Sequence, residues 1–236
     1  MTTYSRASLA RLAALADAVD VAEGMRAFTD ATSDAWARPG ELVDRARQLA
    51  ELARAVLTHT VIHERLKGTS WEAIGWGLGD ISKQAAQARY GDAERDFRRR
   101  ALLAWLEPDV ATRHLGSSVG EVPGTVEMLT EWWQAHRQPN EPDKADPVAA
   151  ALAPLGAPEA SAMAIEAAGL LNGDDRPADP HTRRVLEIGL ARRKVELYER
   201  LAAELPDDVQ TLEVLAGARA RLAELTDSSR PPATQS

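Results

Sequence analysis

Apolar residues recur at steps of three and four along most of this chain, the spacing that places them on one side of an α-helix. The first stretch with this spacing covers residues 5–23, and its apolar positions are Leu9, Leu12, Leu15, Val19 and Ala22. A second stretch covers residues 41–66 and is followed by Gly68, at the position expected of a helix C-cap. The pattern therefore predicts two long helices joined by a loop at residues 30–40.

The same spacing predicts further helices at residues 92–106, 124–137, 158–171, 181–205 and 208–225. Residues 115–123 are expected to form a loop, because Gly and Ser are frequent there. In residues 181–205 the apolar positions follow a seven-residue pattern, formed by Ile188, Ala191, Val195, Tyr198, Ala202 and Leu205. A weaker repeat in residues 208–225 predicts that the last two helices form an antiparallel hairpin.

The composition changes this picture little, because strand-forming residues are sparse and Ala, Leu, Glu and Arg abound. The fold class is therefore predicted to be all-α. Residues 138–147 hold three Pro and four charged residues and are the best candidate for a linker. We expect a helical domain at residues 1–137, an acidic helical domain at residues 148–226 and a disordered tail at residues 227–236.

The net charge of −8 argues against a nucleic-acid partner until its distribution is considered. Residues 41–105 carry 11 basic and 9 acidic side chains, whereas residues 106–236 carry 13 basic and 22 acidic ones. Only the middle segment suits a polyanion. Its small surplus of positive charge predicts moderate, salt-sensitive binding unless a dimer doubles the contacts.

Several chemistries are excluded or disfavoured by what the chain lacks. The absence of Cys excludes disulfides, thiolate metal sites and a cysteine nucleophile. No secretory signal and no apolar run of about eighteen residues is present, so a cytoplasmic protein that does not cross a membrane is expected. His59 and His63 stand four residues apart but lack the Glu of a zinc-protease motif. No nucleophile elbow or phosphate-binding loop occurs, and we expect no enzyme, metal or cofactor.

Residues 68–90 carry the most specific pattern in the chain and predict two short helices joined by a tight turn. They read Gly-Thr-Ser-Trp-Glu-Ala-Ile-Gly-Trp-Gly-Leu-Gly-Asp-Ile-Ser-Lys-Gln-Ala-Ala-Gln-Ala-Arg-Tyr. Thr69 and Glu72 have the spacing of a capping box at the start of the first helix. Gly79 can adopt the positive φ of a tight turn, and Ser82 is a natural N-cap for the second helix.

The apolar and small residues of this segment predict how the two helices pack. Ile74 and Leu78 point to one side of the first helix, and Gly75 lies where a second helix must cross closely. Ala85 and Ala86 allow close packing of the second helix, and Tyr90 closes the core at its end. Trp71 and Trp76 are interpreted as packing residues rather than as platforms for single-stranded nucleic acid.

This segment resembles the helix-turn-helix DNA-binding proteins that are common in high-GC actinobacteria. In those proteins a Ser-Trp-…-Ile-Gly-…-Leu-Gly helix precedes a Ser-(Lys/Arg)-Gln-Ala-Ala-…-Arg-(Phe/Tyr) recognition helix. The high content of Ala and Arg fits a GC-rich genome of that kind. The resemblance covers residues 69–90, with one departure: Asp80-Ile81 fills the turn where the pattern has a single apolar residue, and an added residue can re-aim the recognition helix.

The resemblance implies a sequence-specific regulator of transcription that binds double-stranded DNA. Its recognition helix, residues 82–90, begins at Ser82 and would lie in the major groove. The side chains expected to read base edges are those of Lys83, Gln84 and Gln87. The side chains expected to contact phosphates are those of Thr69, Ser70, Arg89, Arg95, Arg98, Arg99 and Arg100. A homodimer, formed through the C-terminal helices, would place two such helices about one DNA turn apart.

Two other functions remain open at this stage. A non-enzymatic adaptor could use the helix-turn-helix fold to contact protein, and the net acidity favours it. A helical enzyme would require a buried polar cleft in the C-terminal part. The surface around residues 83–100 discriminates between DNA binding and the adaptor. A continuous basic face there favours DNA, whereas arginines neutralised by Asp92, Glu94 and Asp96 favour protein contacts.

Overall fold

A computed structural model describes residues 4–30, 36–137, 147–174 and 176–227 of the chain. The described residues form helices and short turns, with no strand beyond an isolated bridge between Tyr4 and Pro154. The prediction of an all-α fold is therefore confirmed at the level of fold class. The expected linker, apart from Pro147, and the expected tail, apart from Asp227, lie outside the described residues.

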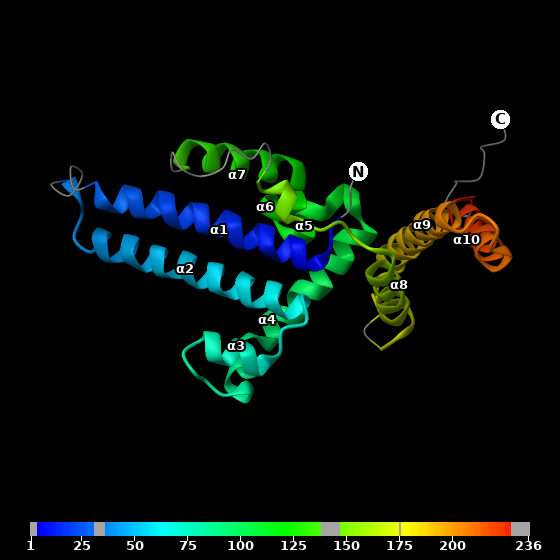
Figure 1. Cartoon of the computed structure of the whole chain (residues 1–236), viewed down its shortest axis with the longest axis horizontal. Helices are drawn as coiled ribbons and strands as arrows, with labels where there is room; N and C mark the ends of the chain where they lie inside the picture. The colour runs from blue at the N-terminus through cyan, green and yellow to red at the C-terminus, as the bar shows by residue number, and fades with distance from the viewer. Residues whose placement is uncertain (1–3, 31–35, 138–146, 175, 228–236) are drawn as a thin grey trace. The chain divides into compact units, whose positions relative to one another are not determined.

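The helices follow one another along the chain as shown in Figure 1. Their bounds are α1 (Arg6–Thr29), α2 (Glu41–Leu66), α3 (Trp71–Gly77), α4 (Lys83–Leu106), α5 (Ala111–Leu115), α6 (Ser117–Gly120), α7 (Val122–His136), α8 (Ala157–Asn172), α9 (Pro180–Glu204) and α10 (Val209–Asp227). Two short 3₁₀ turns complete them, at Pro108–Val110 and Ala149–Ala151. The chain divides into two compact units: unit 1 comprises residues 1–101 and 111–154, and unit 2 comprises residues 102–110 and 155–236.

Unit 1 is built on α1 and α2, which lie side by side along their lengths (Figure 1). One core cluster joins Ala10 of α1, Ile62 of α2 and Phe97 of α4, all at most 2% exposed. A second joins Leu12 of α1 to Leu129 of α7. Burying such apolar side chains supplies most of the stability of a helical unit, because isolated helices are marginal in water.

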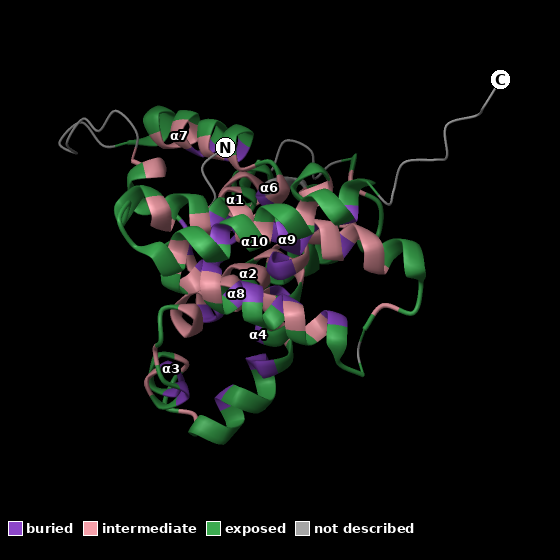
Figure 2. Ribbon diagram, turned by 90° about the vertical axis from the view of Figure 1, so that its right-hand side faces the viewer, coloured by how far each residue is buried: buried purple, intermediate pink, exposed green. Residues whose placement is uncertain are grey.

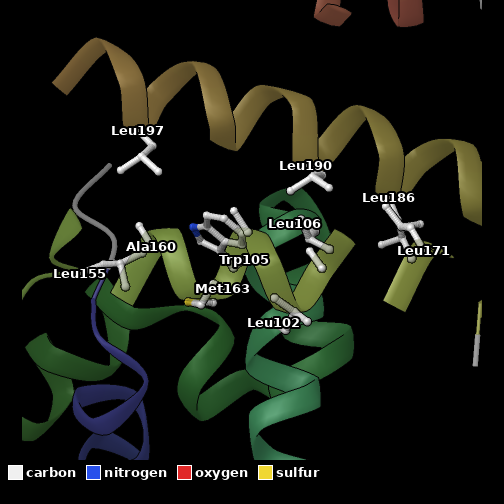
Figure 3. Close-up of a cluster of buried hydrophobic side chains, with 12 residues drawn as sticks. Leu102, Trp105, Leu106, Leu155, Ala160, Met163, Leu171, Leu186, Leu190 and Leu197 are labelled. Atoms are coloured by element: carbon white, nitrogen blue, oxygen red, sulfur yellow. The ribbon is translucent and has the colours of Figure 1, made fainter. Parts of the chain in front are cut away.

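Unit 2 has its own core, formed by the last turns of α4 together with α8 and α9 (Figure 3). Leu186 and Leu190 of α9 lie in the same cluster as Trp105 of α4. A methyl group on Gly189 would come within 2.4 Å of the Leu106 carbonyl oxygen, so the close approach of these helices requires glycine. Arg193 also donates from Nε to the Trp105 carbonyl oxygen, at 2.6 Å.

Three predictions of helix and loop bounds need correction. The first helix continues to Thr29, beyond the expected end at residue 23. A new helix does not start at residue 92, because α4 runs without a break from Lys83 through Gly91. The loop expected at residues 115–123 is instead the end of α5, the short helix α6 and the start of α7. Gly and Ser cost a helix little near its ends, where most of these residues lie.

The seven-residue pattern in α9 identified only part of its packing. The positions Ile188, Val195 and Tyr198 are only partly buried, whereas Leu186 and Leu197 lie in the core. The helix contacts both α8 and α10, so it needs apolar residues on two sides. A single seven-residue pattern of apolar positions describes only one of these two packed sides.

Candidate functional site

The strongest candidate site is the corner formed by α3, the turn at residues 78–82 and the start of α4, called here the α3–α4 corner. Its own small core consists of Val61, Trp71, Ile74, Ala86 and Tyr90, with Leu78 and Ile81 packed against it. The predicted inward positions of Ile74, Leu78, Ala86 and Tyr90 are confirmed. Ala85, also expected to pack, is exposed instead.

Two consecutive residues in the left-handed region form the turn of the corner. Gly79 has φ +90° and Asp80 has φ +59°. The first angle confirms the role predicted for glycine, and aspartate is among the few other residues that adopt this conformation readily. The added residue is thereby taken up within the turn, and Ile81 still packs against the corner's core.

Gly75 is required by this turn rather than by a crossing helix. A Cβ at this position would lie 2.3 Å from the Ile81 carbonyl oxygen, which is backbone and cannot move aside cheaply. In the same contact, the Ile81 backbone N–H donates to the Gly75 carbonyl oxygen at 3.1 Å. The close approach of these two backbones therefore fixes where α4 begins relative to α3.

The capping box expected at Thr69 and Glu72 is wrong. Ser70 is the N-cap of α3, and its Oγ accepts from the Ala73 backbone N–H at 3.1 Å. The Thr69 hydroxyl instead donates to a carboxylate oxygen of Glu64 at 2.7 Å and holds the pKa of that carboxyl below its usual value. The second predicted cap is confirmed, because Ser82 Oγ accepts from the Ala85 backbone N–H at 3.1 Å.

The first two turns of α4 present the side chains expected to contact bases. Lys83, Gln84 and Gln87 are exposed, and none has an ion pair or side-chain hydrogen bond within the described part of the chain. Figure 2 shows this end of α4 as largely exposed. Arg89 is also exposed, with its guanidinium 5.4 Å from the centre of the Tyr90 ring. We call residues 83–89 the open segment of α4.

The following turns of α4 differ, because acidic neighbours occupy their arginines. Arg95 pairs with Asp92, Arg98 with Glu94, and Arg100 with Asp96, the last at 2.9 Å. Glu94 is buried, whereas Asp92 and Asp96 are exposed. We call residues 92–100 the paired segment of α4. Arg99 is the one arginine of this segment without an ion pair to a described residue.

The two tryptophans of α3 have opposite environments. Trp71 is 8% exposed, and the Arg65 guanidinium lies over its ring at 4.7 Å, so its predicted packing role is confirmed. Trp76 is 64% exposed, and the packing role predicted for it is wrong. It lines a hollow of about 470 Å³ whose other walls are Glu72, Asp80, Ile81, Ser82, Lys83 and Gln84. The sequence signal for this site was weak, because an exposed and a buried Trp look alike in a short helix.

The paired histidines of α2 face different partners. His59 Nδ1 lies 2.6 Å from a carboxylate oxygen of Asp17, and His63 Nδ1 lies 2.8 Å from the Ala7 carbonyl oxygen. Each therefore ties α2 to α1. Among the described residues, no group of three or more His, Asp or Glu side chains is arranged to hold a metal ion.

Comparison of the chain with protein-family models, with curated proteins and with solved structures found no match. In the described part of the chain, no helix has the length and apolar character needed to span a membrane. The function therefore has to be argued from the geometry and chemistry of the α3–α4 corner.

Proposed function

We propose that this protein binds double-stranded DNA in a sequence-specific manner and regulates transcription without catalysing a reaction. In this proposal α3 and α4 act as a helix-turn-helix, and the open segment of α4 enters the major groove. The observation that carries the proposal is the state of Lys83, Gln84 and Gln87. These side chains are exposed at the start of a helix held by a packed corner, and no described residue binds them.

The position and chemistry of these side chains suit base reading. In helix-turn-helix proteins the N-terminal residues of the second helix reach the base edges. A glutamine can bond adenine through two hydrogen bonds, and a lysine can donate to the acceptors of guanine. The open segment is rigidly based, because Ala86 and Tyr90, on the opposite side of the same turns, are buried in the corner's core.

The pairing of the arginines limits which of them bind phosphate. A paired arginine must give up its carboxylate to contact phosphate, whereas Arg89 and Arg99 have no ion pair to lose among the described residues. We therefore assign the phosphate contacts to Arg89 and Arg99. Arg89, Arg99 and Lys83 together supply about three cationic contacts per subunit. A plot of the logarithm of the affinity against the logarithm of the salt concentration should therefore have a slope of about −3.

The regulation proposed is steric, by occupation of an operator. A homodimer through the C-terminal helices would pair two half-sites and double the phosphate contacts. It is supported by exposed apolar side chains on α10, among them Val209 and Leu212, at 66% and 44% exposed. Light scattering coupled to size exclusion measures the mass directly. A monomer at every concentration, including with DNA, would contradict this part of the proposal.

A second function is favoured by a specific observation. Three arginines of the paired segment are neutralised by acids on the same helix, as expected of an adaptor whose helix-turn-helix contacts protein. The two functions differ in the role of the open segment. DNA binding needs its lysine and glutamines, whereas an adaptor predicts no preference for any duplex.

The deciding experiment measures fluorescence anisotropy of labelled duplexes taken from around the protein's own gene, at two salt concentrations. The test variant combines Lys83→Ala, Gln84→Ala and Gln87→Ala. The control variant combines Gln48→Ala and Arg54→Ala on α2, which also removes one positive charge and an exposed amide. We expect tight binding to one duplex, resistant to competitor DNA, retained by the control and lost by the test variant. The adaptor would be favoured if binding were equally strong for every duplex, were abolished by salt and were retained by the test variant.

A further inference from the structure

The hollow beside Trp76 combines three groups with no partner elsewhere in the described chain. Trp76 is 64% exposed, and neither an aromatic ring nor a cation lies over it. Glu72 and Asp80 are exposed on the walls of the same hollow, and neither has an ion pair with a described residue. This differs from the paired segment of α4, where each acid is matched by an arginine.

Other tryptophans of this chain show what such a ring accepts. An arginine guanidinium lies 4.7 Å from the Trp71 ring, 5.7 Å from that of Trp105 and 6.0 Å from that of Trp133. The attraction comes from the negative face of the indole, and tryptophan is the best of the aromatic side chains in this respect. Trp76 offers the same face without an arginine.

The Trp76 ring attracts any cation, whereas the carboxylates of Glu72 and Asp80 beside it favour a guanidinium in particular. A guanidinium is planar, keeps its charge at all physiological pH values, and can stack on a ring while donating to carboxylates at its edge. Lys83 and Gln84 also line the hollow, so the two carboxylates lie beside side chains that the proposed function assigns to DNA. The carboxylates themselves repel phosphate and attract a cation. The hollow and the open segment of α4 therefore adjoin and share Lys83 and Gln84, but Trp76 and the two carboxylates belong to the hollow alone.

We propose that the hollow formed by Glu72, Trp76 and Asp80 binds an arginine side chain of a basic segment in another protein. The proposal rests on the proposed function, because it names a protein partner for the same corner that binds DNA. The partner's arginine stacks on Trp76 and donates to Glu72 and Asp80.

The test follows the indole N–H resonance of Trp76 by NMR in the full-length protein, without DNA, and Trp76→Phe identifies that resonance. The probe is the blocked pentapeptide Gly-Arg-Gly-Arg-Gly. Its control has citrulline, the neutral isostere, in place of both arginines. We expect a saturable shift of the Trp76 resonance with the arginine peptide and none with the citrulline peptide.

Two variants make the test specific to the hollow. Glu72→Gln with Asp80→Asn removes both carboxylates, and Asn tolerates the positive φ at position 80. Glu127→Gln with Glu131→Gln makes the same change of charge at exposed positions on α7. The first variant should bind the peptide at least about tenfold more weakly, because charge-assisted hydrogen bonds are lost, and the second should bind it unchanged. The other indole resonances report whether each variant is folded.

The proposal would be overturned by an equal shift with the citrulline peptide, by a shift that survives in the Glu72→Gln, Asp80→Asn variant, or by no shift at Trp76 at all. A Trp76 shift that appears on raising the concentration of the protein alone would also overturn it, since the occupant would then be a second copy. DNA binding is measured separately by anisotropy. A protein that binds DNA but not the arginine peptide would contradict only the role of the hollow, whereas a protein that does not bind DNA would contradict the proposed function.

Discussion

The open and paired segments of α4 belong to one continuous helix, and although the paired segment carries four basic residues against two in the open segment, a smaller proportion of them is free of an acidic partner among the described residues. In the open segment Lys83 and Arg89 have no acidic partner among the described residues. In the paired segment Arg95, Arg98 and Arg100 each hold a neighbouring carboxylate. A count of charges along the sequence therefore overstates the surface available to a polyanion, because an ion-paired arginine presents little net charge.

The largest effect is expected at the contact that aims the open segment. Gly75→Ala should lower the free energy of unfolding by about 3 kcal/mol, because the new Cβ meets the Ile81 carbonyl at 2.3 Å. Chemical denaturation measures this change. Gly77→Ala is the control in the same helix, since a Cβ there meets nothing within 4 Å, and it should stabilise by up to about 1 kcal/mol. Equal effects of the two variants would show that the backbone contact does not fix the corner.

The paired segment is expected to support folding more than binding. Arg98→Ala should cost about 2 kcal/mol of folding stability, because it leaves the buried Glu94 carboxylate without this partner. The matched variant Arg95→Ala removes a pair whose members are both exposed, and it should cost less than about 0.5 kcal/mol. Urea denaturation of both variants checks the difference. If Arg98→Ala left the free energy of unfolding unchanged, water would already screen the charge of Glu94.

The open segment should show the opposite behaviour. Lys83→Ala should weaken binding to the preferred duplex about tenfold and reduce the salt slope by about 1, since one base contact and one released counterion are lost. Its folding stability should not change, because the side chain is exposed. Anisotropy titrations at several salt concentrations provide both quantities. If Arg98→Ala, tested at a temperature where it is folded, weakened DNA binding as much as Lys83→Ala, the distinction between the two segments would fail.

The smallest effect concerns the support beneath α3. Thr69→Val should cost about 1 kcal/mol near neutral pH, because it removes the hydroxyl that donates to Glu64. This bond lowers the pKa of Glu64 in the folded protein, so its stabilisation is fully present above the ordinary glutamate pKa and is lost as the pH falls through the lowered pKa. Thermal unfolding at about pH 7 and about pH 3 should show that the difference in stability between the wild type and Thr69→Val becomes smaller in acid. If this difference in stability were the same at both pH values, the cost of Thr69→Val would come from packing and not from the hydrogen bond to Glu64.

The sequence was a good guide where local rules apply and a poor one where packing decides. The 3.6-residue spacing predicted α2 to the residue. The left-handed Gly68 just after the C-cap of α2 and the cap at Ser82 follow from glycine and side-chain chemistry. The break expected at Gly91 is absent, because that glycine is buried within a helix whose neighbouring turns pack in two cores. A single glycine costs a helix about 1 kcal/mol, which such burial readily offsets.

By itself, the sequence determined the all-α fold class, most helix positions and the inward positions of Ile74, Leu78, Ala86 and Tyr90 in the α3–α4 corner, since these depend on spacing and on local hydrogen bonding. Only the tertiary structure decided which side chains are available. It paired Arg95, Arg98 and Arg100 with acids, left Lys83, Gln84 and Gln87 open, and placed Trp76 beside Glu72 and Asp80. The acids three or four residues from each arginine are visible in the sequence and made these pairs conceivable. The rotamers that form the pairs and the packing that leaves Trp76 exposed depend on the surroundings of each side chain, which the order of residues does not record.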